Sequence, residues 1–366
     1  MNEFMRIGDI CDILNGYAFK SSKYVTDGIR VIRITNVQKG FVEDTNPQYY
    51  PVSEQREIEK YMLCEGDLLM SLTGNVGRVG LLSAEMLPAA LNQRVACIRI
   101  RNPAVIYKPF LFHLLNSDYF ENKCILASQG VAQKNMSTEW LKEYPIPSFS
   151  MDKQMEIASI FDKIDDLIAR RKEQVRNMDQ AVKSRFIELF GDPVINPKGF
   201  PCYTVGEVID FQGGSQPDKK YFEYEASPDN IRLIQIRDYK SDKYITYIPK
   251  TMAKRFCTAD DIMIGRYGPP IFQILKGIEG SFNVALMKAT PKIGNKEFVR
   301  QFLKQDCLLE YLEGLSKRTA GQDGIQMDKL KAYPFPYPPI ELQEQFAAFV
   351  EQTDKSKLCG KMEVAA

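Results

Sequence analysis

The sequence has one histidine and one tryptophan in 366 residues, and its charge is almost balanced, with 48 Lys and Arg against 47 Asp and Glu. The histidine, His113, lies in the apolar stretch "FLFHLLNS", which favours a packed helix residue over a catalyst. Mechanisms that use histidine as a general base therefore have almost nothing to work with. With a net charge of +1, any nucleic-acid surface must gather its basic residues on one face.

Long apolar runs are missing as well. No stretch approaches the ~20 residues needed to cross a bilayer, and the start "MNEFMRIGDI" lacks the basic and apolar segments of a signal peptide. The eight cysteines are scattered without a CxxC pair, which is typical of reduced thiols and not of a zinc site or a disulfide framework. We therefore expect a cytoplasmic protein without a metal site.

A chain of this length predicts two domains, and a hydrophobic content of 44% is enough for a substantial interior. The sequence repeats itself in order, which indicates an old duplication of one domain plus the helix after it. The matching segments are "IGDICDILNG" (7–16) with "VGEVIDFQGG" (205–214), "IRVIRITNV" (29–37) with "IRLIQIRDY" (231–239), "DLLMSLTG" (67–74) with "DIMIGRYG" (261–268), and "EYPIPSFSMDKQMEI" (143–157) with "AYPFPYPPIELQEQF" (332–346).

Each copy contains short β-rich segments such as "VIRITNV", "VACIRI" and "DIMIGR", bounded by Gly, Asn or Pro, and one helical stretch before its closing motif. This pattern predicts an α+β fold with two tandem mixed domains, each with a curled sheet. The proline-rich motif marks where each globular copy ends and a helix begins. We expect domains at residues 1–150 and 191–339, with long helices at 151–190 and 340–366.

Residues 152–190 predict a long helix, which at 1.5 Å per residue would extend roughly 58 Å. Its apolar residues follow a 4,3 heptad, with Arg171 and Arg185 in the two remaining positions, and such a seam needs a second helix beside it. The helix from about Glu341 is the natural antiparallel partner in a coiled coil. The residues assigned to this coiled-coil and partner-binding surface are Ile157, Phe161, Ile164, Ile168, Val175, Met178, Val182, Leu189, Phe346 and Val350.

Catalytic motifs are weak. The series "GNVGRVG" (74–80) lacks the Gly-Lys-Ser/Thr ending of a phosphate loop, so a tight turn is the better interpretation. The tripeptide "ENK" (121–123) has the Glu-x-Lys spacing of many nucleases, but such a tripeptide arises by chance in most chains of this length. We find neither a methyltransferase cofactor loop nor the motif of amino-methylating enzymes.

Polar residues gather in Gly-containing connections of both copies. Asn, Gln and Arg can read base edges with two hydrogen bonds, whereas Lys, Ser and Thr suit phosphates. Singly, each is an ordinary solvated side chain; their repetition in both copies favours DNA contact. The DNA-contacting set expected here is Lys20, Lys23, Arg33, Asn36, Thr73, Asn75, Arg78, Gln93, Arg94, Gln129, Gln133, Lys134, Gln216, Lys219, Lys220, Arg237, Arg266, Tyr267, Gln322 and Gln326.

Over essentially its full length the sequence resembles the specificity subunit of type I restriction–modification systems. The resemblance rests on the two proline-rich helix entries, on "IELFGDPVINPKGFP" between the copies and on "VEQTDKS" near the end. It implies two target recognition domains that each read half of a split double-stranded DNA sequence, separated by helices in an antiparallel coiled coil that set the spacer.

The resemblance also implies a protein that is not itself an enzyme and carries no cofactor. Modification (methyltransferase) subunits would dock on it and bring S-adenosylmethionine. Restriction subunits would join through them and bring ATP and Mg for translocation and cleavage. These partners and cofactors are expectations from the family plan.

The second helix departs from that plan, because "LCGKMEVAA" brings Gly360 and no continuing heptad. We therefore expect a short second helix, as in a truncated or shuffled subunit unable to assemble fully. Two other classes compete with the specificity subunit. One is a free-standing two-headed nuclease, which needs a carboxylate cluster, and the other is a protein-interaction scaffold, which would not show salt-dependent DNA binding.

Overall fold

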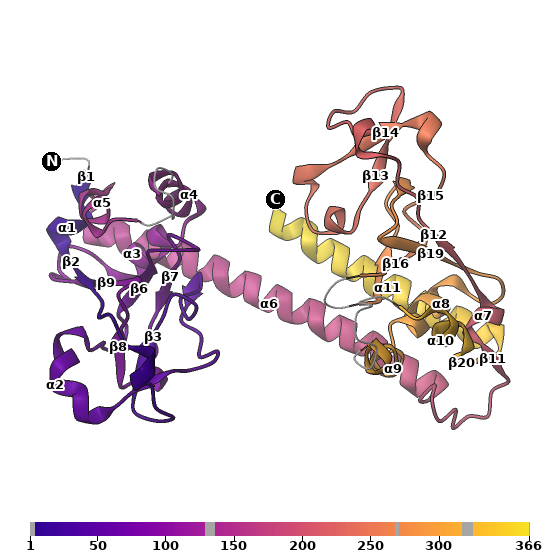
Figure 1. Cartoon of the computed structure of the whole chain (residues 1–366), viewed down its shortest axis with the longest axis horizontal. Coiled ribbons are helices and arrows are strands. Elements are labelled where there is room, and N and C mark those ends of the chain that lie inside the picture. Colours follow the sequence, from indigo (N-terminus) through magenta and orange to yellow (C-terminus); the bar gives the residue numbers. More distant parts are fainter. Residues whose placement is uncertain (1–3, 129–135, 268–270, 317–324, 366) are drawn as a thin grey trace. The chain divides into compact units, whose positions relative to one another are not determined.

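The computed structural model describes residues 4–128, 136–267, 271–316 and 325–365, and the chain divides into two units, Met1–Ile168 and Ala169–Ala366 (Figure 1). The long helix α6, Met151–Phe190, begins in unit 1 and ends in unit 2. This confirms the predicted α+β class and its two domains. Within the described residues, no helix is long and apolar enough to span a membrane.

Unit 1 contains two main sheets. The larger sheet has the order β2-β9-β6-β7-β4 and the smaller one β5-β3-β8, with parallel pairs only at β4/β7 and β3/β8. The strands are β2 Cys11–Asn15, β3 Ile29–Ile32, β4 Gly40–Phe41, β5 Tyr49–Tyr50, β6 Leu68–Ser71, β7 Val79–Leu81, β8 Ala89–Leu91 and β9 Val95–Ile100.

Figure 1 shows α1, α3, α4 and α5 at one end of the larger sheet and α2 with the smaller sheet at the other end. The helices are α1 Ile7–Ile10, α2 Gln55–Ile58, α3 Lys108–Leu115, α4 Asp118–Ala127 and α5 Thr138–Glu143, with 3-10 turns η1 Ser21–Lys23, η2 Val52–Glu54, η3 Glu59–Tyr61 and η4 Ala84–Met86. Separate apolar cores lie under the helices and under the smaller sheet.

Unit 2 repeats this plan with sheets of order β12-β19-β16-β17 and β14-β13-β18-β15. Its strands are β12 Ile209–Gly213, β13 Asn230–Ile234, β14 Tyr247–Pro249, β15 Phe256–Cys257, β16 Ile262–Gly265, β17 Gln273–Lys276, β18 Gly280–Phe282 and β19 Leu286–Pro291. Its helices are α7 Val205–Val208, α8 Lys296–Leu303, α9 Asp306–Ser316, α10 Met327–Ala332 and α11 Ile340–Ala365, with 3-10 turns η5 Lys219–Tyr221, η6 Ile236–Tyr239, η7 Asp242–Tyr244 and η8 Lys250–Met252.

The expected curled sheet is wrong. In each unit the strands divide between two separate sheets, and the individual strands have only two to six residues. Sheet twist accumulates along and across strands, so such short strands give little curvature before the chain leaves for the other sheet. The sequence showed the strands but not their division.

The proline-rich motifs are strands that close each unit. β10 (Pro145–Pro147) pairs with β1 (Phe4–Arg6), and β20 (Pro334–Pro336) pairs with β11 (Cys202–Thr204). A two-stranded ribbon tolerates proline because a strand there needs partners on one side only. The central residues Ile146 and Phe335 are fully buried, so each ribbon also seals the core under the start of the long helix.

A buried glutamine attaches each long helix to its unit. In unit 1, Gln154 Oε1 accepts from the backbone N–H of Tyr107 at 2.8 Å, and its Nε2 donates to the carbonyls of Val105 and Phe149 at 3.0 and 2.9 Å. In unit 2, Gln343 Oε1 accepts from Asn295 N–H at 2.8 Å, and its Nε2 donates to the Pro338 carbonyl at 2.8 Å. Both side chains are fully buried.

In unit 2 the end of α6 contacts α11. Phe346 packs against Phe186 and Phe190, while Lys357, further along α11, forms a 2.7 Å ion pair with Asp179, earlier on α6. The two helices therefore run antiparallel through this unit. α11 continues through Gly360 to Ala365, so that glycine does not end the helix.

The predicted seam residues fall into three groups. Val182, Leu189, Phe346 and Val350 join the core of unit 2, and Ile157 packs on the core of unit 1. Phe161 and Ile164 are exposed, and the remaining residues are half-buried: Ile168, Val175 and Met178. Their role in partner binding stays a prediction.

In each unit one glycine allows the backbone that leaves one sheet to lie close to the backbone that leaves the other sheet. A Cβ on Gly214 would lie 1.9 Å from the Asn283 carbonyl oxygen, and one on Gly16 would lie 2.2 Å from the same atom of Asn92. Both contacts involve backbone, so a side chain here has no flexible neighbour to displace. The preceding glycine, Gly213, has open space at its Cβ.

We predict that Gly214→Ala destabilises unit 2 by about 3 kcal/mol, because the backbones of β12 and the loop after β18 must separate. Gly213→Ala is the matched control and should change stability by about 0.5 kcal/mol or less. Urea-dependent hydrogen exchange of peptides from β12 and β19 measures both. Equal effects of the two substitutions would contradict the close approach.

Candidate nucleic-acid interface

Several loops of unit 1 meet at the junction between its two sheets. The Leu72 N–H donates to the Arg94 carbonyl at 3.0 Å, and the Met136 N–H donates to the Leu72 carbonyl at 2.9 Å. The Gln93 N–H donates to the Tyr17 carbonyl at 2.9 Å. The loops after β2, β6 and β8 and the segment before α5 are thereby held together.

Side chains at this junction differ in how far they are exposed to solvent. Lys20, Asn75, Gln93 and Arg94 are exposed, whereas Thr73 is half-buried. Within the described parts of the chain, the Lys20 and Arg94 side chains form no ion pair. The structure thus brings two cations and two amides to neighbouring loops, a set suited to phosphates and base edges.

Other predicted residues of unit 1 are engaged within the fold. Lys23 forms a 2.7 Å ion pair with Glu54, and this hydrogen bond lowers the pKa of Glu54 and raises that of Lys23. The Arg33 guanidinium donates to the Asn46 carbonyl at 2.6 Å, and Arg78 donates to Gln38 at 2.8 Å. Their contact with DNA stays a prediction.

Tyr17 lies at the same junction. Its hydroxyl donates to Glu57, and this hydrogen bond, together with burial, raises the pKa of Tyr17 to about 12. The phenol is therefore neutral at physiological pH.

Unit 2 has the equivalent junction with different side chains. The Arg266 N–H donates to the Ala285 carbonyl at 2.9 Å, and Asn283 Nδ2 donates to Gln216 Oε1 at 3.4 Å. The Arg266 guanidinium lies 5.3 Å from the centroid of the Tyr267 ring, which is itself exposed. This junction therefore presents an aromatic ring and an arginine where unit 1 presents Thr73 and Leu72.

The remaining predicted residues of unit 2 lie nearby or outside the described chain. Lys219 and Lys220 are exposed on η5, and the Arg237 side chain donates to Thr246 at 2.9 Å. Gln326 is half-buried at the start of α10. The predicted residues outside the described ranges are Gln129, Gln133, Lys134 and Gln322.

Val284 lies next to this junction and is 46% exposed, and it was not among the residues predicted from the sequence. Sequence reasoning also missed Asn283, which was noticed only as a mark of the repeat. The pairing of "ALNQ" with "SFNV" was the available signal, because a residue kept at a sheet junction positions its neighbours.

Asn36 and Asp238 occupy the same position in the two units and fold a turn. The Arg33 N–H donates to Asn36 Oδ1 at 3.0 Å, and the Gln235 N–H donates to Asp238 Oδ2 at 3.1 Å. Both side chains are buried. Burial raises the pKa of Asp238, opposed by the Gln235 hydrogen bond and by the nearby Arg232.

The described residues contain no cluster of three or more His, Cys, Asp or Glu that could hold a metal ion. The described cysteine side chains are free: Cys11, Cys64, Cys97, Cys124, Cys202, Cys257 and Cys307. The chemistry that the described loops support is hydrogen bonding and charge pairing.

Comparison with known proteins agrees with this pattern. The chain matches the family described as type I restriction modification DNA specificity domain over residues 2–177 and 197–360. It is 25% identical over 385 residues to the putative type I restriction enzyme MjaX specificity subunit of Methanocaldococcus jannaschii, covering 96% of this chain and 86% of that protein.

Two further comparisons differ in coverage. The MjaVIII specificity subunit of the same organism is 27% identical over 185 residues, which is 50% of this chain and 43% of that subunit. The crystal structure of a type I system S subunit from M. genitalium superimposes with a TM-score of 0.53 at 15% identity, over 99% of this chain and 91% of that one, and shows a shared fold.

The chain therefore belongs to the family of type I restriction–modification DNA specificity subunits, with one specificity domain in each half. Subunits of this family are non-catalytic and carry no cofactor of their own. The prediction of a non-enzymatic subunit is confirmed by this membership, and the free-standing nuclease is excluded by it.

We predict that Asp238→Asn alters the pH dependence of unit 2 stability. Because the pKa of Asp238 is raised in the folded state, the parent loses stability as pH rises through that pKa. The variant lacks this loss, so the difference in unfolding free energy should shift in its favour from pH 4 to pH 7. Urea unfolding of unit 2 at both pH values, followed by hydrogen exchange, measures the shift.

Asp242→Asn serves as the control for this prediction, because it removes an exposed carboxylate from the same Arg232. It should show no gain on going to pH 7. A pH-independent difference between Asp238→Asn and the parent would contradict the raised pKa.

Proposed function

We propose that the chain reads a split, asymmetric double-stranded DNA target, with unit 1 contacting one half and unit 2 the other. The observation that carries the proposal is the repeated junction, in which Gly16 packs on Asn92 and Gly214 on Asn283. The backbone of this junction is kept while the side chains on it differ. Two readers with one scaffold and different side chains suit two different half-sites.

Phosphate contacts supply most of the affinity in such a subunit. The exposed cations Lys20, Arg94, Lys219 and Lys220 lie on or near the junction loops. Neutralising phosphates releases counterions, so binding should weaken steeply as salt rises. A scaffold that does not bind DNA would lack this dependence.

The long helices have two roles in this proposal. α6 has 40 residues and would extend about 60 Å if straight, so it sets the unread spacer between the half-sites. α6 and α11 also form the surface on which modification subunits dock. Those subunits bring S-adenosylmethionine, and restriction subunits joined through them bring ATP and Mg.

Recognition of each half of the target should depend on one arginine of the corresponding unit. We predict that Arg94→Ala relaxes recognition in one half of the target only and that Arg266→Ala relaxes the other half only. The loss of a two-pronged base contact costs about 1–3 kcal/mol, or roughly 5- to 150-fold in discrimination. The measurement is methylation by the assembled complex on a library with both half-sites randomised.

The two variants control for each other, since each removes one arginine from the junction of its own unit, Arg94 from the loop after β8 and Arg266 from the loop after β16. A loss of affinity that is uniform across all sequences would show that these arginines contact phosphates and not bases. Changes in both halves from one substitution would overturn the division of labour.

The spacer should follow the length of α6. Deleting residues 168–174 removes one heptad, keeps the seam within a ~20° phase error and shortens the helix by roughly 10 Å. We predict an optimal spacer about three base pairs shorter, at ~3.4 Å per pair. Affinity should also drop, because three pairs turn the duplex by about 100°.

The control replaces residues 168–174 by another heptad with the same apolar positions, which should keep the parental spacer. Methylation of a library of spacer lengths by each assembled complex gives the optimum. A parental optimum in the deletion variant would reject the role of α6 as the spacer.

A further inference from the structure

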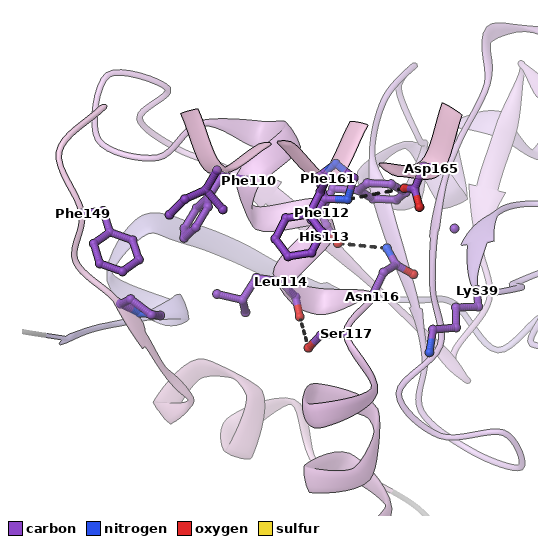
Figure 2. A pocket seen from close by; sticks show the side chains of 13 residues that line it. Lys39, Phe110, Phe112, His113, Leu114, Asn116, Ser117, Phe149, Phe161 and Asp165 are labelled. Carbon is purple, nitrogen blue, oxygen red and sulfur yellow. Dashed lines mark hydrogen bonds and ion pairs between the residues drawn. The ribbon is translucent and has the colours of Figure 1, made fainter. Parts of the chain in front are cut away.

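An apolar hollow of about 500 Å³ lies on unit 1 where α3 meets α6 (Figure 2). Phe110 and Phe112 of α3 and Ile157 and Phe161 of α6 line it. A second hollow, of about 590 Å³, adjoins it across Leu114. Phe161 remains 47% exposed. Contiguous apolar surface of this kind is typical of an interaction site.

The same surface of unit 2 is covered. The unit 2 residues that correspond to Phe110, Leu114, Ile157 and Phe161 are at most 2% exposed, whereas in unit 1 only Phe110 of these four is buried and Phe161 is the most exposed. By the order of the repeat, Phe298 and Phe302 of α8 correspond to Phe110 and Leu114, and Phe346 and Val350 of α11 correspond to Ile157 and Phe161. Since the two surfaces share their elements, what covers one indicates what fits the other.

The carboxyl end of α6 covers this surface in unit 2. Phe186 stacks on Phe298 with ring centroids 5.7 Å apart and meets Phe346 at 5.6 Å. Phe190, one turn later, meets the same two rings at 4.7 and 5.4 Å. Val182, one turn earlier, joins the same core. Two rings one helical turn apart therefore fill the position that is hollow in unit 1.

Charge accompanies this packing in unit 2. Lys183, three residues before Phe186, forms a 2.8 Å ion pair with Asp306, the first residue of α9. In unit 1 the first residue of α4 is also an aspartate, Asp118. Its side chain is 90% exposed, although it pairs with Lys39. The acidic partner for a lysine on an incoming helix is therefore present beside the unit 1 hollow.

The opposite rim of the hollow is acidic too. Figure 2 shows His113 beside Asp165, with Phe161 next to both. His113 Nε2 lies 2.7 Å from Asp162 Oδ1, and Nδ1 lies 3.7 Å from Asp165 Oδ2. Both carboxylates are largely exposed. Lys39 also lines the hollow but is paired with Asp118 and Glu121, so the carboxylates of both rims favour a basic helix over an acidic one.

We infer that these adjoining hollows of unit 1 are a docking site for an amphipathic helix of another polypeptide, with two aromatic rings one turn apart and a lysine three residues before the first ring. Residues 182–190 of the same chain do not supply it, because Val182, Phe186 and Phe190 are buried in unit 2. The inference goes beyond DNA reading and does not depend on it.

The test uses a fluorescein-labelled peptide of residues 175–195 as the probe, since it carries Lys183, Phe186 and Phe190 on a length that can form a helix. The full chain should bind it, and the Phe186→Ala, Phe190→Ala double variant of the peptide should bind about tenfold more weakly or worse. Fluorescence anisotropy measures both. No binding of the parent peptide at millimolar chain would overturn the inference.

Variants of the chain locate the site. Phe161→Lys should weaken peptide binding about tenfold, whereas Ile160→Lys is the matched control. Ile160 is 49% exposed on the same helix and does not line either hollow, so its substitution should leave binding unchanged. Equal binding by the Phe161→Lys chain and the parent would overturn the assignment.

Two further measurements decide between occupants. A photoreactive group at position 186 of the peptide should crosslink to α3 or α6 of unit 1, and crosslinks elsewhere would contradict the site. Light scattering of the free chain should show a monomer. A dimer abolished by Phe161→Lys would show that the occupant is a second copy of this chain and would overturn the proposal of a different polypeptide.

Discussion

The hydrogen bonds of one buried glutamine in each unit determine where the long helices leave their domains. Gln154 and Gln343 lie in the first turn of α6 and α11, and each accepts the backbone N–H of the residue just before α3 or α8, respectively. A buried amide with all its partners in protein costs about 1–3 kcal/mol when one partner is lost. The helices are therefore held at a defined point of each unit, next to the proline ribbon that seals the core.

Within a common plan the two units differ in the number of strands in each sheet and in the side chains of the junction loops. The closing ribbon and the glycine contacts with Asn92 and Asn283 are shared, because each depends on backbone that approaches backbone. The side chains on the junction loops face outward and have no such constraint. Divergence there changes what the loops contact without changing how the unit folds, which is what the proposed reading of two half-sites needs.

Sequence reasoning found the duplication, the closing motifs, both long helices and the polar loops of the junctions. It failed where a residue depends on distant partners. The strands of one unit divide between two sheets, and period-two patterns carry no information on that division. A strict 4,3 heptad omitted Phe186 and Phe190, which the core of unit 2 takes beside Val182 and Leu189, because a globular unit surrounds the helix end on more than one side.

The sequence by itself determined the order of elements, the repeat and the family, since these follow from local propensity and from residues matched in order. Only the tertiary structure decided which of the predicted contact residues are exposed and which are engaged within the fold. Asn36 and Lys23 are engaged within unit 1, while Arg94 remains exposed. Likewise Val350 is buried and its equivalent Phe161 is not, because burial depends on which neighbour the fold brings against a surface, and the residue's own chemistry does not specify that neighbour.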